Sequence, residues 1–335
     1  MNVEHHARLS ATEITQLWSA YMNDSMAICV LTYMDNIVED EGVKEIVNYG
    51  LKLSESHKEK LKAFFNMEKY PIPVGFHLNE DVDVNAERLY SDTYILNFMR
   101  DMAQVGMNNY SMATSLAARE DVYNYFSACF VESNKLHRMA KDLMLSKGVY
   151  VRSPNLPIPS KVDFVKKQSF LTGWFGERRP LTGMEISNLY ANMQRNVLGV
   201  AALISFSQVA KSKEVRQFMQ RGKEIAEKHV EVLGSILREN ELPAPMSWNA
   251  EITENTSFVF SDKLMMFQIT ALVGIGIGNY GLSLATSHRR DLVAQYTRLT
   301  TEIMKYSEDG ANIMISNGWL EEPPRESDRQ ELADG

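Results

Sequence analysis

Two stretches of the chain share one pattern of apolar and polar positions. Within residues 213–245, apolar or small side chains recur at alternating spacings of three and four, as on one face of a long α-helix. These positions are Val215, Phe218, Gly222, Ile225, His229, Val232 and Ile236. The same or near-matching residues stand 172 positions earlier, at Val43, Ile46, Gly50, Leu53, His57, Lys60 and Phe64. One helical sequence therefore occurs twice, which indicates an internal duplication of the chain.

Each copy carries four helical segments. In the first copy they cover about residues 9–38, 43–69, 91–118 and 120–147. A capping box of Ser10 and Glu13 opens the first segment, and Thr182 with Glu185 repeats it in the second copy. Arg119 and Asp121 fall in the tight turn between the third and fourth helices and are expected to form a solvated pair. Arg289 and Asp291 are their counterparts in the second copy.

The connection between the second and third helices is long in both copies. Residues 70–89 and 242–259 begin with prolines and show no helical period. About 20 extended residues reach on the order of 60 Å, which exceeds the length of helices of this size. The connection therefore runs back along the bundle, so that the second and third helices are parallel, as in ferritin-like four-helix bundles. We predict an all-α protein of two tandem ferritin-like four-helix bundles.

The duplication also sets the predicted boundaries. Four parts are expected: a first bundle over 1–150, a linker over 151–180, a second bundle over 181–321 and a disordered tail over 322–335. The linker is expected to be partly packed, because it carries Trp174 and Phe175, whose exposure to water is unfavourable.

Composition narrows the range of partners and locations. The chain has 335 residues, 44% of them hydrophobic, and a net charge of −8, which argues against nucleic-acid binding. Residues 1–13 hold no apolar run typical of a signal peptide. The apolar stretch 264–278 is short for a membrane span, so we expect a buried helix there. These patterns predict a cytoplasmic protein without a nucleic-acid or membrane partner, and they leave a homo-oligomer open.

The two cysteines, Cys29 and Cys129, both lie in the first copy. Their counterparts in the second copy are Ala201 and Leu299. Both cysteines are therefore expected to be small core residues in a reducing compartment, not partners in a disulfide.

Several segments resemble a known family. They are residues 170–203, 206–229 and 261–267, together with GIGNYG at 276–281 and DGANIMISNGWLE at 309–321. These segments are similar to a family of duplicated, uncharacterised proteins from spore-forming Gram-positive bacteria, catalogued as a domain of unknown function. The resemblance implies a ferritin-like fold. Because some members carry the provisional label of spore-coat protein, it also implies an association with spores, and it implies no particular activity.

A di-metal centre of the ferritin kind requires Glu-x-x-His on each of two helices. Ser54 stands three residues before His57, and Ala226 stands three residues before His229. Neither histidine therefore has the glutamate that this pattern requires, which argues against a di-metal oxidase.

A smaller set of polar residues remains inside each predicted bundle. Counting along the helices places four of them at similar depth in the first copy: Asp24, His57, Asn109 and Glu132. Their counterparts are Asn196, His229, Asn279 and Glu302. One interpretation is a buried His–Glu hydrogen bond that fixes helix register, since buried polar groups need partners. The other is one Fe, Mn or Zn ion held by His57 and Glu132 and completed by water or Asp24.

The first copy is the better metal candidate, because it also offers Asp101 and His137. The candidate metal ligands are His57, Glu132, Asp24, His137, His229 and Glu302, and the candidate structural residues are Gly50, Gly222, Asn109 and Asn279. Gly50 and Gly222 are expected to mark close approaches between helices, because a glycine inside a helix costs about 1 kcal/mol relative to alanine.

Two classes of function follow from the sequence. The incomplete carboxylate sets favour a non-enzymatic structural or interaction protein, with spore association implied by the resemblance alone. The alternative is a metal-binding ferritin-like protein or oxidase with His/Glu sites inside the bundles.

Overall fold

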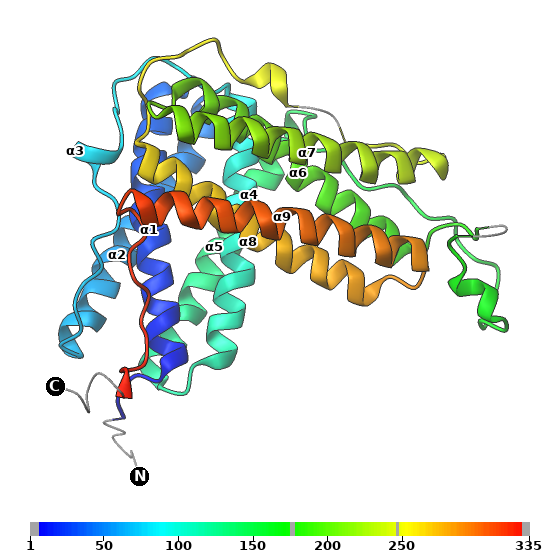
Figure 1. The fold of residues 1–335 in the computed structure, drawn as a ribbon, viewed down its shortest axis with the longest axis horizontal. Coiled ribbons are helices and arrows are strands. Elements are labelled where there is room, and N and C mark those ends of the chain that lie inside the picture. The colour runs from blue at the N-terminus through cyan, green and yellow to red at the C-terminus, as the bar shows by residue number, and fades with distance from the viewer. Residues whose placement is uncertain (1–6, 175–177, 246–247, 330–335) are drawn as a thin grey trace. The chain divides into compact units, whose positions relative to one another are not determined.

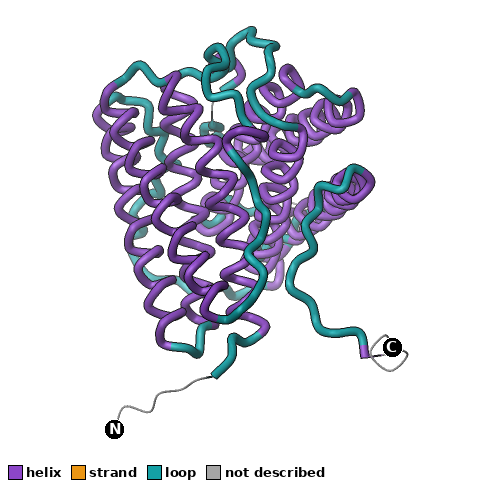
Figure 2. Tube along the Cα trace, turned by 90° about the vertical axis from the view of Figure 1, so that its left-hand side faces the viewer, coloured by secondary structure: helices purple, strands orange, loops and turns teal. Residues whose placement is uncertain are grey.

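The computed structural model describes residues 7–174, 178–245 and 248–329. The chain divides into two compact units: one comprises the residues up to Val149 together with those from Leu320 onward, and the other is Tyr150–Trp319. The described residues form helices joined by loops, and they include no strand (Figure 2).

Each unit contains four long helices (Figure 1). Those of the first unit are α1 (Ala11–Ile37), α2 (Glu41–Met67), α4 (Asp92–Leu116) and α5 (Glu120–Ser146), with the short α3 (Leu78–Asp81) between α2 and α4. Those of the second unit are α6 (Gly183–Val209), α7 (Lys213–Glu239), α8 (Asp262–Thr286) and α9 (Arg290–Ser316), with short 3₁₀ turns at Gln168–Leu171 and Asn249–Glu251. The predicted all-α fold with four helices per copy is confirmed.

Local sequence explains where the helices begin and end. The predicted capping boxes form at both places, Ser10 with Glu13 at α1 and Thr182 with Glu185 at α6. The glycines Gly148 and Gly318 follow α5 and α9 with φ of +70° and +67°, a conformation that favours glycine and ends a helix.

Contacts at the helix ends establish the direction of the helices in the first unit. Asp92, the first residue of α4, accepts hydrogen bonds from the backbone N–H groups of Glu39 and Asp40, directly before α2, at 3.2 and 2.8 Å. Helices α2 and α4 therefore begin at the same end of the bundle and run parallel. The second unit repeats the contact: Asp262 accepts from the backbone of Lys211 and Ser212 at 3.1 and 2.8 Å. The predicted crossover geometry is confirmed in both copies.

The opposite end of each bundle is closed by the capping-box glutamate. Glu13 accepts hydrogen bonds from the backbone N–H groups of Ala118 and Arg119, between α4 and α5, at 2.9 and 2.8 Å. Between these ends, apolar side chains from the four helices of the first bundle form a core that includes Leu17, Leu61 and Phe126.

Helix α8 is less buried than the sequence predicted. Leu264, Met265 and Ile269 are buried, but Gly278 is exposed and Leu282 is 62% exposed. By length and composition alone, α8 is long and apolar enough to cross a membrane. The expectation of a buried helix over 264–278 holds for its first half, whereas residues 271–278 are half-buried, with Gly274 and Gly278 exposed.

The chain returns to the first unit at its C-terminal end. Glu321 accepts hydrogen bonds from the backbone N–H groups of Val74 and Gly75, in the first crossover, at 3.0 and 3.1 Å. The segment expected to be a disordered tail, 322–335, is described as far as residue 329, and its remainder lies outside the described residues. Of the predicted linker, residues 175–177, and with them Phe175, lie outside the described residues, and Trp174 is exposed.

Candidate functional site

His57 lies at the centre of the first bundle, on the inner face of α2, with 3% of its surface exposed. Its Nε2 lies 2.7 Å from Oε2 of Glu132 on α5. Its Nδ1 lies 3.6 Å from Oδ1 of Asp24 on α1. The structure thus brings together three of the residues that sequence reasoning selected, with one carboxylate facing each ring nitrogen.

Cys129 is the residue that sequence reasoning missed. One ligand atom each from His57, Cys129 and Glu132 lie within 4.8 Å of one another. Cys129 is fully buried, as expected of a core residue, but it also faces the polar cluster. The sequence spacing could have indicated this position, because Cys129 stands three residues before Glu132 and therefore shares its helix face.

Asp24 is a buried carboxylate without full pairing. Its side chain is nearly inaccessible, and its Oδ2 has no hydrogen-bond partner among the described residues. Burial raises the pKa of Asp24, although His57 and Ser54 favour its charged form. An unsatisfied carboxylate oxygen in a bundle core is energetically unfavourable.

The charges of the cluster are coupled. Burial disfavours a charged imidazole at His57, but the side chains of Asp24, Cys129 and Glu132 outweigh it and raise the pKa of His57 well above its ordinary value. The hydrogen bond from His57 lowers the pKa of Glu132 against the opposing effect of burial. Without another cation, these interactions favour an imidazolium at His57 beside an ionised Glu132.

Aromatic rings enclose the cluster. The edges of Tyr110 and Tyr125 meet the ring of His57 at centroid distances of 5.9 and 6.1 Å. The Oη atom of Tyr125 is buried and has no hydrogen-bond partner among the described residues. This apolar wall keeps the surroundings of His57 at low dielectric, where charged groups interact strongly.

The second bundle has a different set around His229. Nδ1 of His229 lies 3.0 Å from Oη of Tyr280, and Nε2 lies 3.2 Å from Oε2 of Glu302. Asn196, the counterpart of Asp24, donates to Oη of Tyr280 at 2.8 Å. Lys228 binds the other oxygen of Glu302 at 2.6 Å. Burial lowers the pKa of His229 more than Glu302 raises it, so this histidine is neutral and fully hydrogen-bonded.

Three predicted residues do not join these clusters. His137 is half-buried on α5, and burial together with Arg100 and Lys141 lowers its pKa. Asn109 is exposed, and Asn279 is half-buried with no hydrogen-bond partner for its Nδ2 within the described part of the chain. The depth estimate from the sequence was too coarse here, because a shift of one position turns a helical side chain by about 100°.

The two inner glycines differ in how tightly they are packed. A Cβ atom at Gly50 would lie 2.6 Å from the terminal methyl of Met99, which is flexible. A Cβ atom at Gly222 would overlap the Oη atom of Tyr306. The ring of Tyr306 is stacked on Phe218 at 4.2 Å and its hydroxyl donates to the Phe218 carbonyl, so it has little freedom to move.

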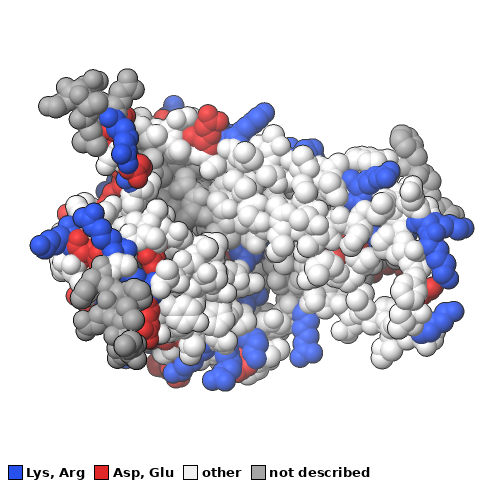
Figure 3. Space-filling model, turned by 90° about the horizontal axis from the view of Figure 1, so that it is seen from below, with Lys and Arg blue, Asp and Glu red and all other residues white. Residues whose placement is uncertain are grey.

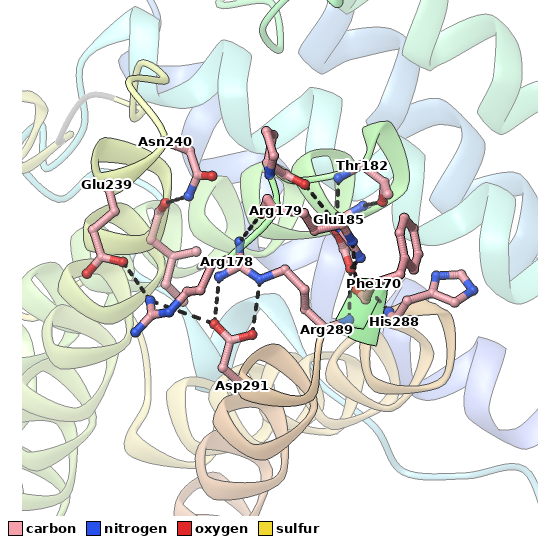
Figure 4. A network of polar contacts seen from close by, with 12 residues as sticks. Phe170, Arg178, Arg179, Thr182, Glu185, Glu239, Asn240, His288, Arg289 and Asp291 are labelled. Carbon is pink, nitrogen blue, oxygen red and sulfur yellow. Dashed lines mark hydrogen bonds and ion pairs between the residues drawn. The ribbon is translucent and has the colours of Figure 1, made fainter. Parts of the chain in front are cut away.

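A second polar network closes the end of the second bundle (Figure 4). Both guanidinium nitrogens of Arg179 bind the carboxylate of Glu185, at 2.8 and 2.9 Å. The same carboxylate accepts from the backbone N–H groups of His288 and Arg289 at 3.2 and 3.1 Å. Burial disfavours the charged form of Glu185, but these donors outweigh it and lower its pKa to about 2.

The turn between α8 and α9 holds a buried ion pair. Arg289 binds Asp291 through two hydrogen bonds, at 3.1 and 2.6 Å, and is only 1% exposed. The pair is buried because the segment before α6 folds over it: Arg178 approaches Asp291 and the carbonyl of Arg179 accepts from Arg289 (Figure 4). In the first bundle, Arg119 binds Asp121 and Glu68 and keeps more exposure.

These features define a duplicated helical-bundle protein with a His/Cys/carboxylate cluster in one copy and a neutral histidine in the other. The chain belongs to the family described as "Protein of unknown function (DUF3231)", whose model matches it twice, over residues 1–162 and 169–332. No curated protein matches the sequence.

Among solved structures, the chain is similar to a "putative spore coat protein" from Bacillus halodurans C-125. The two are 18% identical, the match covers 45% of this chain and 98% of the other, and the TM-score is 0.40.

Proposed function

We propose that the first bundle binds one divalent transition-metal ion, Fe²⁺, Mn²⁺ or Zn²⁺, at His57 and Glu132. In this arrangement Nε2 of His57 and a carboxylate oxygen of Glu132 are ligands. Asp24 faces the other ring nitrogen and orients the imidazole, as carboxylates do behind many metal-bound histidines.

The observation that carries this proposal is the contrast between the two copies. The second bundle has the same helices and the same His–Glu contact, with Asn196 and Leu299 in place of Asp24 and Cys129. The fold therefore does not require an acid or a thiol at these positions. Their presence in the first bundle, beside a buried histidine, fits a ligand set better than it fits helix packing.

The ion pairing of the two glutamates, Glu132 and Glu302, also differs between the bundles. In the second bundle Lys228 pairs with Glu302 at 2.6 Å. Its counterpart in the first bundle is the uncharged Ser56; Lys60 lowers the pKa of Glu132 by its charge without an ion pair of this kind. The carboxylate of Glu132 is thus directed to the cluster, whereas that of Glu302 is shared with a surface cation.

For the second bundle we propose a structural role, in which His229, Tyr280 and Glu302 hold three helices in register. The whole protein is then a non-enzymatic binding or structural protein. Spore association, implied by the family resemblance, and a cytoplasmic location, expected from the composition, remain part of this proposal. No reaction is assigned to the bundles.

Metal analysis of protein purified without an affinity tag tests the proposal. We expect close to one equivalent of metal per chain, and a higher melting temperature when Fe²⁺, Mn²⁺ or Zn²⁺ is added to metal-free protein, because a ligand that binds only the folded state stabilises it. Asp24→Asn, which copies the second bundle, should reduce this shift, and His229→Leu should keep it. A metal-free protein whose melting temperature responds to none of the three ions would overturn the proposal.

A further inference from the structure

The sulfur of Cys129 lies close to both proposed metal ligands. The thiol lies one helical turn before Glu132 on α5, and its sulfur, an imidazole nitrogen of His57 and a carboxylate oxygen of Glu132 lie within 4.8 Å of one another. Ligands around one tetrahedral ion, with bonds of about 2.0–2.3 Å, lie roughly 3.5 Å apart. Small side-chain movements would therefore bring all three atoms to a common ion.

We infer that Cys129 is a direct thiolate ligand of the ion, and that it makes the site selective for Zn²⁺ over Mn²⁺. The inference rests on the proposed metal site. Coordination forms the metal–sulfur bond and releases the thiol proton to solvent, with no change of oxidation state. Thiolates favour Zn²⁺, whereas Mn²⁺ favours oxygen ligands.

Asp24 has a distinct place in this arrangement. It faces Nδ1 of His57 at 3.6 Å, while Nε2 faces Glu132 at 2.7 Å and is the nitrogen directed to the proposed ion. Asp24 is therefore a positioning residue that would accept a hydrogen bond from Nδ1–H once the ring turns toward the ion. Its Oδ2, buried in the core and without a partner among the described residues, is available for this bond.

The two cysteines provide a matched pair for the test. Cys29 and Cys129 are both buried and neither forms a disulfide, and among the described residues it is Cys129 that lies in the cluster of possible ligands. Cys29 reports on the general effect of replacing a core thiol, and Cys129 reports on the proposed bond.

The experiment is Co²⁺ titration of the metal-free, full-length protein, followed by absorption spectroscopy. We expect visible d–d bands and a near-ultraviolet sulfur-to-cobalt charge-transfer band, both removed by added Zn²⁺ and unaffected by equal Mn²⁺. Cys129→Ser should lose the charge-transfer band and bind Zn²⁺ on the order of tenfold more weakly or worse, and Cys29→Ser should retain both properties.

The outcomes separate the two proposals. If the wild type shows d–d bands and a melting shift but no charge-transfer band, Cys129 is not a ligand and the proposed metal site stands without it. A charge-transfer band that disappears in Cys29→Ser and persists in Cys129→Ser also overturns the inference. If Co²⁺ and Zn²⁺ produce neither bands nor a melting shift, the inference fails, and the proposed metal site fails with it when Fe²⁺ and Mn²⁺ also give no melting shift. If Cys129→Ser does not fold, the spectra of the wild type and of Cys29→Ser together decide the case.

Discussion

His57 and His229 are the same residue of a duplicated helix, and their neighbours give them opposite charge states. Asp24 and Glu132 surround His57 and favour its imidazolium form. In the second bundle Asn196 stands in place of Asp24, and the Oη atom of Tyr280 lies beside Nδ1 of His229, so burial prevails and the ring stays neutral. Two replacements on the neighbouring helices, Asn196 for Asp24 and Leu299 for Cys129, accompany this change in the charge state of the histidine.

Replacing each histidine by leucine should therefore have unequal effects. His57→Leu leaves the carboxylate of Asp24 buried without a counter-charge, and we expect it to lose about 3 kcal/mol or more of unfolding free energy. His229→Leu leaves Glu302 paired with Lys228 and should lose about 1–2 kcal/mol. Chemical denaturation of metal-free protein measures both losses. Addition of Asp24→Asn should restore part of the stability of His57→Leu, and equal losses in the two single variants would contradict this explanation.

The glycines give a second comparison between the copies. Gly222→Ala pushes a methyl group into Tyr306, whose ring is held by Phe218, and should cost about 1–3 kcal/mol. Gly50→Ala meets only the mobile end of Met99, and the better helix propensity of alanine, about 1 kcal/mol, should offset most of that contact. Thermal unfolding of the two variants provides the measurement, and a Gly50→Ala protein less stable than Gly222→Ala would refute the packing argument.

The sequence predicted the His–Glu contact because register along two helices is regular and the duplication supplied a check. It did not reveal Cys129 as part of the cluster, because its counterpart Leu299 made it look apolar. Nor did it distinguish the charge states of the two histidines. These depend on which atoms of Asp24, Tyr280 and Lys228 reach the ring, and helical spacing does not determine that.

At the scale of elements, the capping-box glutamates do more than begin a helix. Glu13 and Glu185 each bind the backbone of the turn between the last two helices of their bundle. Only Glu185 also binds an arginine, Arg179, whose counterpart in the first copy is Ala7. The helix start and the distant turn are thus joined by one carboxylate, more firmly in the second bundle.

This difference predicts a dependence on pH. The folded-state pKa of Glu185, about 2, lies below that of an unfolded glutamate, so its ionised form stabilises the protein above about pH 4.5 and this contribution is lost as the pH falls toward 2. Glu185→Gln should lose up to about 3 kcal/mol at pH 7 and show a smaller further loss on acidification than the wild type. Unfolding at pH 7 and pH 3 measures both effects. The control, Glu13→Gln, should lose less, and an equal loss would contradict the role of Arg179.

At the scale of the whole molecule, the duplication and the parallel second and third helices of each copy were predictable, because both rest on spacing that repeats. The return of the C-terminal segment to the first unit was not. The residues around Glu321 have no periodic pattern, and their partners, Val74 and Gly75, offer only backbone N–H groups. Every residue except proline has a backbone N–H group, so the residue types at these two positions could not indicate the contact.

Glu321→Ala tests this contact. Removal of the carboxylate leaves the N–H groups of Val74 and Gly75 without their acceptor, so we expect their hydrogen exchange to accelerate while the helices of the first bundle keep their protection. Mass-spectrometric or NMR exchange measurements detect this directly. Glu322→Ala, which alters an exposed neighbour, should leave both amides unchanged. Slow exchange at both amides in Glu321→Ala would show that the contact does not protect them.

The same contact imposes an order on events at the ribosome. Glu321 follows Gly75 by 246 residues, and at synthesis rates of about 5–20 residues per second it is made roughly 10–50 s later. Helical bundles fold within microseconds to milliseconds, so the four helices of the first bundle assemble long before this carboxylate exists. The contact closes only after the second bundle has been translated. In a nascent chain halted before residue 321, the N–H groups of Val74 and Gly75 therefore do not yet have the Glu321 carboxylate as an acceptor.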